Sequence, residues 1–178
     1  MKSVRWLAVS LLLTGCAVAR LSPVGTSATA ELRDASNRVV GQATLIEVSG
    51  GVRIVLEARG LPPGEKAVHL HAVGTCDPPD FTSAGDHVNP QKKLHGLLNP
   101  QGPHAGDLSN VTIEANGTGQ LETFIDRVTL GPGTATVLDD DGTALVVHAK
   151  PDDFQTDPAG NSGPRIACGR LEKVQLKP

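Results

Sequence analysis

The chain has 178 residues, of which 20% are charged and only 2% are aromatic. Its 16 basic and 19 acidic residues give a net charge of −3, which argues against a nucleic-acid partner. The length suits one domain with a hydrophobic core once a leader has been removed. That core must be aliphatic, because the sequence contains three Phe and no Tyr.

The first 15 residues have the pattern of a signal peptide. Lys2 and Arg5 precede the apolar run 6–13, which is too short to cross a bilayer. Residues 13–16, Leu-Thr-Gly-Cys, resemble a bacterial lipobox, in which the chain is cut before a cysteine that then carries lipid. We therefore expect a lipoprotein signal peptide (1–15), lipidation at Cys16 and a tether (16–26). An ordinary signal peptide with an incidental cysteine is the alternative.

This leader bears on the compartment and on the charge of the mature chain. Removal of residues 1–15 would leave 14 basic and 19 acidic residues, a net charge of −5. We expect an exported, periplasmic or cell-envelope protein whose only membrane contact is the lipid at Cys16. Ala17, in place of Asp after the cysteine, favours the outer membrane if the organism has one.

From residue 27 to the end, we expect one all-β domain. Short β-favouring segments recur between turn signals, and no stretch shows a capped helical period. Gly50-Gly51, Asn116-Gly117 and Asp141-Gly142 are hairpin signals. This spacing is typical of a β-sandwich or barrel. The strands are expected at 28–32, 38–47, 51–59, 67–73, 110–115, 120–124 and 144–148, with one more near Thr136.

Two long irregular stretches, 74–109 and 149–163, interrupt the strands. Both are rich in Gly, Pro, Asp and Asn, and loops of such length are usually functional or disordered. The remaining cysteines, Cys76 and Cys168, form an even pair in an exported chain, which predicts a disulfide across a loop of about 90 residues. Two free buried thiols would instead suit a reducing cytosol.

All six histidines lie between positions 69 and 148, and their spacing is typical of metal ligands. His69 and His71 are two residues apart, so they share one face of a strand, and a neighbouring strand can bring His148 to them. An H-x-H pair alone is as often structural as functional. His95, His104 and Asp107 offer two imidazoles and a carboxylate suited to zinc, and His87 could complete either group.

Five motifs then resemble those of the copper/zinc superoxide dismutases, over about residues 28–171. The motifs are H-L-H-A-V-G-T-C (69–76), S-A-G-D-H-V-N-P (83–90), H-A-G-D-L-S-N-V (104–111), L-V-V-H (145–148) and G-P-R-I-A-C-G (163–169). The resemblance implies a Greek-key β-sandwich or flattened eight-stranded barrel with two long metal-site loops. It also implies copper and zinc as cofactors and superoxide as substrate.

The resemblance further implies a role for each matched residue. His87 would bridge the two metals and supply a proton to the nascent peroxide, and Arg165 would attract and position superoxide beside the copper. Asp152 would orient one histidine on each side, whereas the adjacent Asp153 reads as a solvated loop residue. Cys76 and Cys168 would form the family disulfide. The copper ligands would be His69, His71, His87 and His148, and the zinc ligands His87, His95, His104 and Asp107.

The chain departs from the family in its second loop, which is short and carries Lys150 as its only base. The basic and acidic cluster that steers superoxide in eukaryotic members has no counterpart, so Lys92 and Lys93 either help Arg165 or are simply solvated. Val88 and Leu97-Leu98 replace residues common in the family and affect packing. The acidic turn 139–142 lacks the further ligands of a calcium loop, and we expect a hairpin turn there.

The function implied is dismutation of superoxide by a Cu(II)/Cu(I) cycle, with a structural zinc. The alternative is a copper- and zinc-sequestering lipoprotein on the same scaffold without turnover. That alternative predicts a missing bridge histidine or channel arginine, and both His87 and Arg165 are present. Monomers and homodimers both occur among bacterial members, so the resemblance leaves the oligomeric state open.

Overall fold

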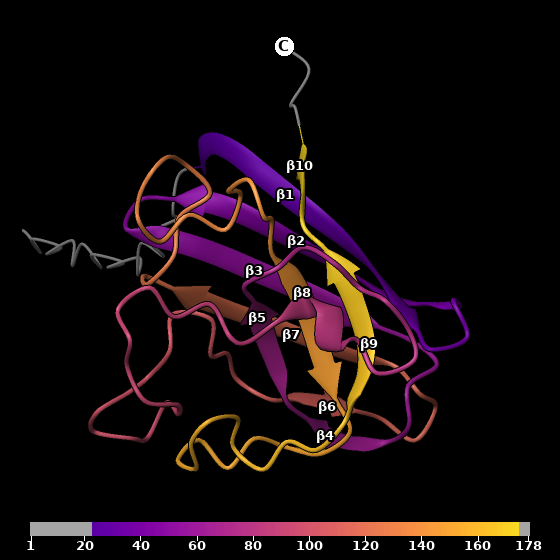
Figure 1. Cartoon of the computed structure of the whole chain (residues 1–178). Helices are drawn as coiled ribbons and strands as arrows, with labels where there is room; N and C mark the ends of the chain where they lie inside the picture. The colour runs from indigo at the N-terminus through magenta and orange to yellow at the C-terminus, as the bar shows by residue number, and fades with distance from the viewer. Residues whose placement is uncertain (1–22, 175–178) are drawn as a thin grey trace, which may run out of the picture.

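The computed structural model describes residues 23–174, and these form an antiparallel β structure (Figure 1). The main sheet curls on itself and runs in the order β5-β8-β9-β1-β2-β3-β7, with β10 added beside β1 and a separate β4-β6 pair. This confirms the expected Greek-key barrel class. The strands are β1 (Pro23–Asp34), β2 (Val39–Val48), β3 (Gly51–Ala58), β4 (Gly64–Lys66), β5 (Val68–His71), β6 (Val111–Ile113), β7 (Gly119–Ile125), β8 (Ala144–His148), β9 (Arg165–Arg170) and β10 (Glu172–Val174).

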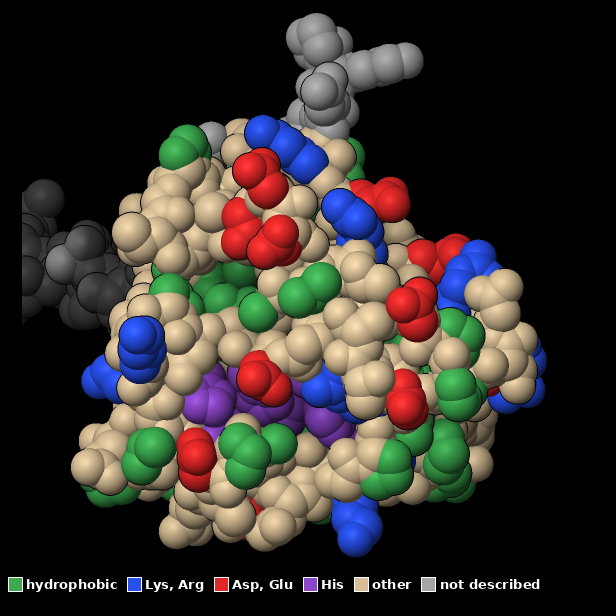
Figure 2. Space-filling model, in the orientation of Figure 1, with side chains coloured by type: hydrophobic (Ala, Val, Ile, Leu, Met, Phe, Trp, Pro, Cys, Tyr) green, Lys and Arg blue, Asp and Glu red, His purple; other side chains and the backbone are tan. Residues whose placement is uncertain are grey.

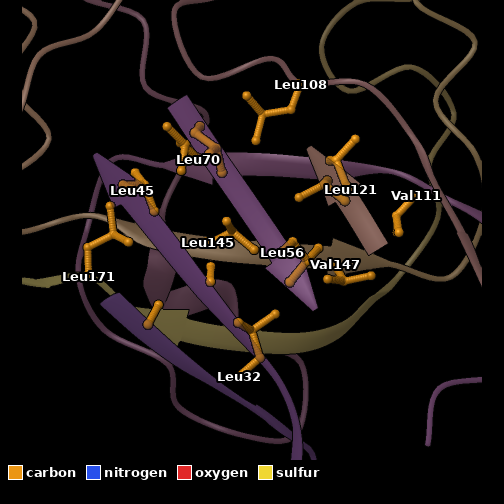
Figure 3. Close-up of a cluster of buried hydrophobic side chains, with 14 of the residues drawn as sticks. Leu32, Leu45, Leu56, Leu70, Leu108, Val111, Leu121, Leu145, Val147 and Leu171 are labelled. Atoms are coloured by element: carbon orange, nitrogen blue, oxygen red, sulfur yellow. The ribbon is translucent and has the colours of Figure 1, made fainter. Parts of the chain in front are cut away.

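The core lies inside the curl of this sheet. Alternate residues of β3 are buried, as the period of two in a strand with one apolar face requires. Leu45 and Leu56 from one part of the sheet share a buried cluster with Leu70 and Leu145 from another (Figure 3). Strands distant in the sheet order therefore pack their apolar faces against each other. The core is aliphatic, as the composition predicts.

Two strands are buried on both faces, and this positions the histidines. Every residue of β5 and β8 is buried. Leu70 and Leu145 point into the main core, whereas Val146 packs outside it with Phe81 and Cys168. The outer face of these strands is thus covered by other parts of the chain rather than by water. His69, His71 and His148 lie on that covered face.

The cover consists of the two long loops, 72–110 and 149–164. The first contains only a short 3₁₀ turn, η1 (Thr82–Ala84), and the second contains no helix or strand. They lie side by side (Figure 1), joined by a hydrogen bond from the Leu98 N–H to the Phe154 carbonyl. The predicted loop boundaries, 74–109 and 149–163, agree with these to within two residues.

Several sequence predictions about the strands were wrong. The strands β4, β9 and β10 were not expected. β9 was missed because Gly169 interrupts its β-favouring pattern, and that glycine is needed because a Cβ there would lie 2.7 Å from the Glu31 carbonyl oxygen of β1. The strand expected near Thr136 is only an isolated bridge to Thr129.

The hairpin signals had mixed outcomes. Gly50 turns β2 into β3 with a φ of 87°, as predicted. Gly117, with a φ of 81°, turns the chain from β6 to β7, but β6 pairs with β4 instead. Gly142 closes a turn on Asp139, but no strand precedes it, so the predicted hairpin at 139–142 was wrong.

The N-terminal predictions lie largely outside the described residues. β1 begins at Pro23, within the stretch 16–26 expected to be a tether, because Pro23 pairs with Val48 of β2. The signal peptide (1–15) and Cys16 lie outside residues 23–174. Within that described range, no helix is long and apolar enough to span a membrane.

Candidate metal centre

The first group of histidines is built on the sheet. His69 and His71 share a face of β5, and β8 pairs alongside with Val146 opposite His69. The His148 N–H donates to the Ala67 carbonyl, which holds the end of β8 against β5. The ring centroids of His69 and His148 are 4.9 Å apart, and those of His71 and His148 are 5.7 Å apart. The strand geometry predicted from the H-L-H pair therefore places three imidazoles together.

His87 comes from the first loop, where that loop runs beside β5. The Val88 N–H donates to the Leu70 carbonyl, and His87 forms an isolated bridge with His71. The His87 ring lies 4.0 Å from the His69 ring and 5.3 Å from the rings of His95 and His104. His87 therefore sits between the strand-borne histidines and those of the loop.

Each strand-borne imidazole is held through one nitrogen and leaves the other free. His69 Nε2 lies 2.8 Å from Asp152 Oδ2, His71 Nδ1 lies 2.8 Å from the Gly85 carbonyl, and His148 Nδ1 lies 3.1 Å from that of Gly163. Among the described residues, only three buried side-chain nitrogen or oxygen atoms have no partner: His69 Nδ1, His71 Nε2 and His148 Nε2. Buried polar atoms are rarely left unpaired, so these three point to a ligand.

One ligand atom each from His69, His71, His87 and His148 lies within 4.8 Å of the others. Three unpartnered imidazole nitrogens and a fourth histidine form a donor set that suits copper. The residues present therefore fit the first metal that the family resemblance implies.

The second group converges on the buried carboxylate of Asp107. Its Oδ1 lies 2.9 Å from His87 Nδ1, 3.0 Å from His95 Nδ1 and 3.4 Å from His104 Nδ1. Four ligands around a tetrahedral zinc are separated by about 3.3 Å, given zinc bonds of about 2.0–2.1 Å. Three imidazoles and one carboxylate at these separations fit a closed zinc site.

By distance alone, His69 also groups with His87, His95 and Asp107. His69 already belongs to the first group, where its Nδ1 has no hydrogen-bond partner. His104 Nδ1 lies 3.3 Å from His87 Nδ1 and 3.4 Å from Asp107 Oδ1, which favours His104 as the fourth member. The structure therefore brings together all four residues of the expected zinc set.

Asp152 contacts one histidine of each group. Its carboxylate lies 2.8 Å from His69 Nε2 and 3.0 Å from His95 Nε2, and it is buried. Asn110 brackets its backbone, accepting from the Asp152 N–H and donating to the Asp152 carbonyl. Sequence reasoning singled out Asp152 but missed Asn110, whose only signal was its place in the motif H-A-G-D-L-S-N-V.

The strand-borne histidines and His95 have opposite protonation tendencies. Burial lowers the pKa of His69 to about 3, of His71 to about 2 and of His148 to about 4, so all three are neutral at pH 7. Burial also disfavours a charge on His95, but hydrogen bonds to Asp107 and Asp152 outweigh it and raise the pKa of His95 to about 9. Without metal, the loop group therefore holds a proton that a cation would displace.

A cavity of about 890 Å³ opens onto the histidines and carries charges of both signs. Figure 2 shows histidine side chains at the base of a hollow, with acidic and basic groups around it. Arg165 lines this cavity, and its guanidinium donates to the carbonyls of Phe81 and Gly85. Among the described residues it forms no ion pair within 4 Å, so no carboxylate neutralises its charge directly. Lys93 lines the cavity, whereas Lys92 does not.

The disulfide predicted between Cys76 and Cys168 is present. It ties the first loop to β9, with a Cα–Cα distance of 5.6 Å. Arg165 begins the same strand, and its partners Phe81 and Gly85 lie on the loop segment just after Cys76. The disulfide and the arginine therefore hold the same part of the loop.

Two further aspartates hold the second loop. Asp153, expected to be a solvated loop residue, accepts from the N–H groups of Gln155 and Thr156, and these bonds lower its pKa to about 2. Asp157 accepts from the His95 N–H at 2.7 Å, linking the second loop to the first. Sequence reasoning gave neither a role, because short polar loop residues carry no periodic signal.

Comparison with known proteins agrees with this geometry. A family model described as copper/zinc superoxide dismutase (SODC) matches residues 39–171. Superoxide dismutase [Cu-Zn] 1 of Aquifex aeolicus is 50% identical over 142 residues, covering 79% of this chain and 84% of that protein. Superoxide dismutase [Cu-Zn] of Caulobacter vibrioides is 42% identical over 149 residues, covering 82% and 86%.

Solved structures share the fold. The crystal structure of a double mutant of a SOD-like protein from Bacillus subtilis superposes with a TM-score of 0.78 at 39% identity. The match covers 80% of this chain and 95% of that chain. Sequence motifs, fold and relatives agree, and the chain belongs to the copper/zinc superoxide dismutase family of bacteria.

Proposed function

We propose that this protein converts superoxide to oxygen and hydrogen peroxide at the floor of the 890 Å³ cavity. The observation that carries the proposal is the trio of buried, unpartnered imidazole nitrogens on β5 and β8, two of whose residues, His71 and His148, line that cavity. Copper would be held by His69, His71, His87 and His148, and zinc by His87, His95, His104 and Asp107.

Copper, when bound, supplies the Cu(II)/Cu(I) cycle that oxidises one superoxide and reduces the next. The strand-borne histidines are neutral at pH 7 because burial lowers their pKa, so their lone pairs are available without loss of a proton. Asp152 and the carbonyls of Gly85 and Gly163 hold the opposite ring nitrogens and so fix each imidazole's orientation.

His87 is proposed as the shared ligand and proton carrier. Its Nδ1 faces Asp107 Oδ1 on the zinc side at 2.9 Å, which leaves Nε2 for the copper side. Nε2 is then the atom that can hold a proton and pass it to the reduced product. Burial lowers the pKa of His87, so the ring favours the uncharged form that a metal ligand requires.

Arg165 is proposed to attract and position the substrate anion. Two carbonyl groups fix its guanidinium in the cavity wall, and no carboxylate among the described residues pairs with it. A fixed, unneutralised cation beside the copper ligands favours an incoming anion. A sequestering protein without turnover would need neither this cation nor an open cavity above the histidines.

Metal analysis combined with an activity assay tests the function. We expect about one copper and one zinc per chain and rapid superoxide loss in the purified protein. His87→Ala should reduce turnover to near background. Full metal loading of the unmodified protein without dismutation would instead establish the sequestering alternative.

We further propose that the mature chain is exported and anchored by lipid at Cys16, with 1–15 removed as a signal peptide and 27–178 as the enzymatic domain. The Cys76–Cys168 disulfide supports an oxidising compartment. The outer membrane is the favoured destination, and a homodimer is compatible with the family. Membrane fractionation of the wild type and Cys16→Ser tests the anchor, which predicts release of the variant into the soluble fraction.

A further inference from the structure

Arg127 contacts the zinc side of the centre from outside both long loops. It lies just after β7, and its Nη2 donates to the Asp107 carbonyl at 2.8 Å while its Nε donates to the His104 carbonyl at 3.3 Å. Its side chain is 28% exposed. One guanidinium thus binds the backbone of two proposed zinc ligands.

The two carbonyls belong to a tight turn that the chain already holds on its other side. Within the turn, the Asp107 N–H donates to the His104 carbonyl, and the His104 N–H donates to Asp107 Oδ2 at 2.9 Å. Gly106 lies against β5, accepting from the Leu70 N–H and donating to the Val88 carbonyl. A Cβ at Gly106 would lie 2.4 Å from the Leu70 carbonyl oxygen, so the turn is pressed close to the strand.

Arg127 completes the enclosure of this turn. A guanidinium is planar and presents its N–H groups at a fixed separation, so two bonds to two carbonyls fix the distance between them. His104 Nδ1 and Asp107 Oδ1, which lie 3.4 Å apart, are carried by those same two residues. The spacing of the carbonyls therefore bears on the spacing of the ligand atoms.

The charge of Arg127 cannot account for a benefit to the metal. A cation placed here repels Zn²⁺, and the nearest carboxylate oxygen, that of the exposed Asp126, lies 3.9 Å from Nη1. Any gain in zinc affinity must therefore come from the fixed spacing of the N–H groups on the Arg127 guanidinium. We infer that Arg127 is a positioning residue of the zinc site, which fixes the turn 104–107 in its ligating form.

Zinc affinity measured by competition with a chromophoric chelator tests this inference on the metal-free, disulfide-bonded protein. Because residues that orient metal ligands typically contribute 10–100-fold to affinity, Arg127→Ala should weaken zinc binding by about that factor. Arg127→Lys retains the charge but only one donor centre, so it should recover only part of the loss. Arg53→Ala removes a surface arginine paired with Glu122 across β3 and β7 and should leave zinc affinity unchanged.

Three further readouts separate positioning from loss of stability. Copper affinity should change less than zinc affinity in Arg127→Ala, because the pairing of β5 with β8 holds His69 and His71 even though His69 bridges to Asp107 of the turn. The visible absorption of Co²⁺ in the zinc site should shift as its tetrahedron distorts. The melting temperature of the metal-free variant shows whether the protein is folded. Zinc affinity that stays within about twofold of the wild type, or equal losses for zinc and copper that follow the melting temperature, would overturn the inference.

This inference rests on the proposed zinc ligands, and its failure is distinguishable from theirs. His104→Ala and Asp107→Ala, measured by the same competition, should each weaken zinc binding more than Arg127→Ala does. If they do not, the ligand assignment is wrong. If they do and Arg127→Ala has no effect, only the role of Arg127 is wrong.

Discussion

The two halves of the metal centre are built by different means. The copper half rests on two strands buried on both faces, and each of its three strand-borne histidines is held through a single ring nitrogen. The zinc half lies in the first long loop, which has almost no regular structure. Asp152 and Asp157 of the second loop, and Arg127 from outside both loops, hold its ligands through hydrogen bonds. Regular structure supplies the geometry on one side, and a network of polar contacts supplies it on the other.

We therefore expect the zinc half to be more sensitive to substitution than the copper half, in its structure and in its metal affinity. A ladder of backbone bonds and apolar packing holds β5 and β8 whatever happens to one side chain. The first loop depends on a disulfide and a few buried polar groups, and loss of one leaves partners unsatisfied. The following predictions test that contrast.

Removal of the disulfide should have the largest effect. Cys76 and Cys168 are separated by 92 residues, and the chain-entropy model assigns such a closure about 4–5 kcal/mol. Cys76→Ser with Cys168→Ser should lower the free energy of unfolding of the metal-free protein by about that amount in urea titrations. A loss below about 1 kcal/mol would show that the loop holds itself without the bridge.

Replacement of Asp152 should separate the halves. In Asp152→Ala both His69 and His95 lose the partner of their Nε2 atoms. Zinc affinity should fall by about 10–100-fold, and copper affinity by less, because the ladder of β5 still places His69. Paired chelator titrations for the two metals measure this. An equal or greater fall for copper would contradict the contrast.

The metal-free protein should be most stable near pH 6.5. Its stability should fall at lower pH and at higher pH, for different reasons. The pKa of His69, His71 and His148 is lowered in the fold, so as pH falls below 6.5 the unfolded chain binds protons and stability is lost. The pKa of His95 is raised to about 9, so its contribution is full below 6.5 and is lost as pH rises through about 9.

Thermal unfolding of the metal-free protein between pH 4 and 10 measures both slopes. His95→Gln should remove the alkaline loss and leave the acid loss, which makes it the matched variant. A profile that His95→Gln leaves unchanged above pH 6.5 would contradict the assignment of that slope to the zinc half.

The smallest effect is expected from Lys93, which lines the cavity that Asp86, Asp139, Asp141 and Asp157 also line. Lys93→Ala should reduce the second-order rate with superoxide a few-fold and weaken its dependence on ionic strength, because a steering charge acts over about a Debye length. Lys92→Ala is the control, since Lys92 does not line the cavity. Equal effects from both variants would mean that neither lysine has a specific role.

Much of the copper half could be predicted from the sequence. An H-x-H pair in a strand-like run has a side-chain direction fixed by the period of two, and His148 ends a second such run. The disulfide followed from the count of cysteines in an exported chain. These inferences succeed because regular structure converts spacing directly into position.

The supporting residues of the zinc half could not be predicted in that way. Arg127, Asn110 and Asp157 act through backbone atoms of residues 20 to 62 positions away, and nothing in their own neighbourhoods signals this. β9 was missed for a related reason, since close contact with β1 demands the glycine that hides its pattern. Tertiary contact, rather than local preference, decides such positions.

Diffraction from metal-loaded crystals, with anomalous data at the copper and zinc edges, tests the central claim most directly. We predict copper within bonding distance of His69 Nδ1, His71 Nε2 and His148 Nε2, zinc within bonding distance of His95 Nδ1, His104 Nδ1 and Asp107 Oδ1, and His87 contacting both metals. One metal occupying both positions, or His87 bound to neither, would contradict a centre assembled from these two halves.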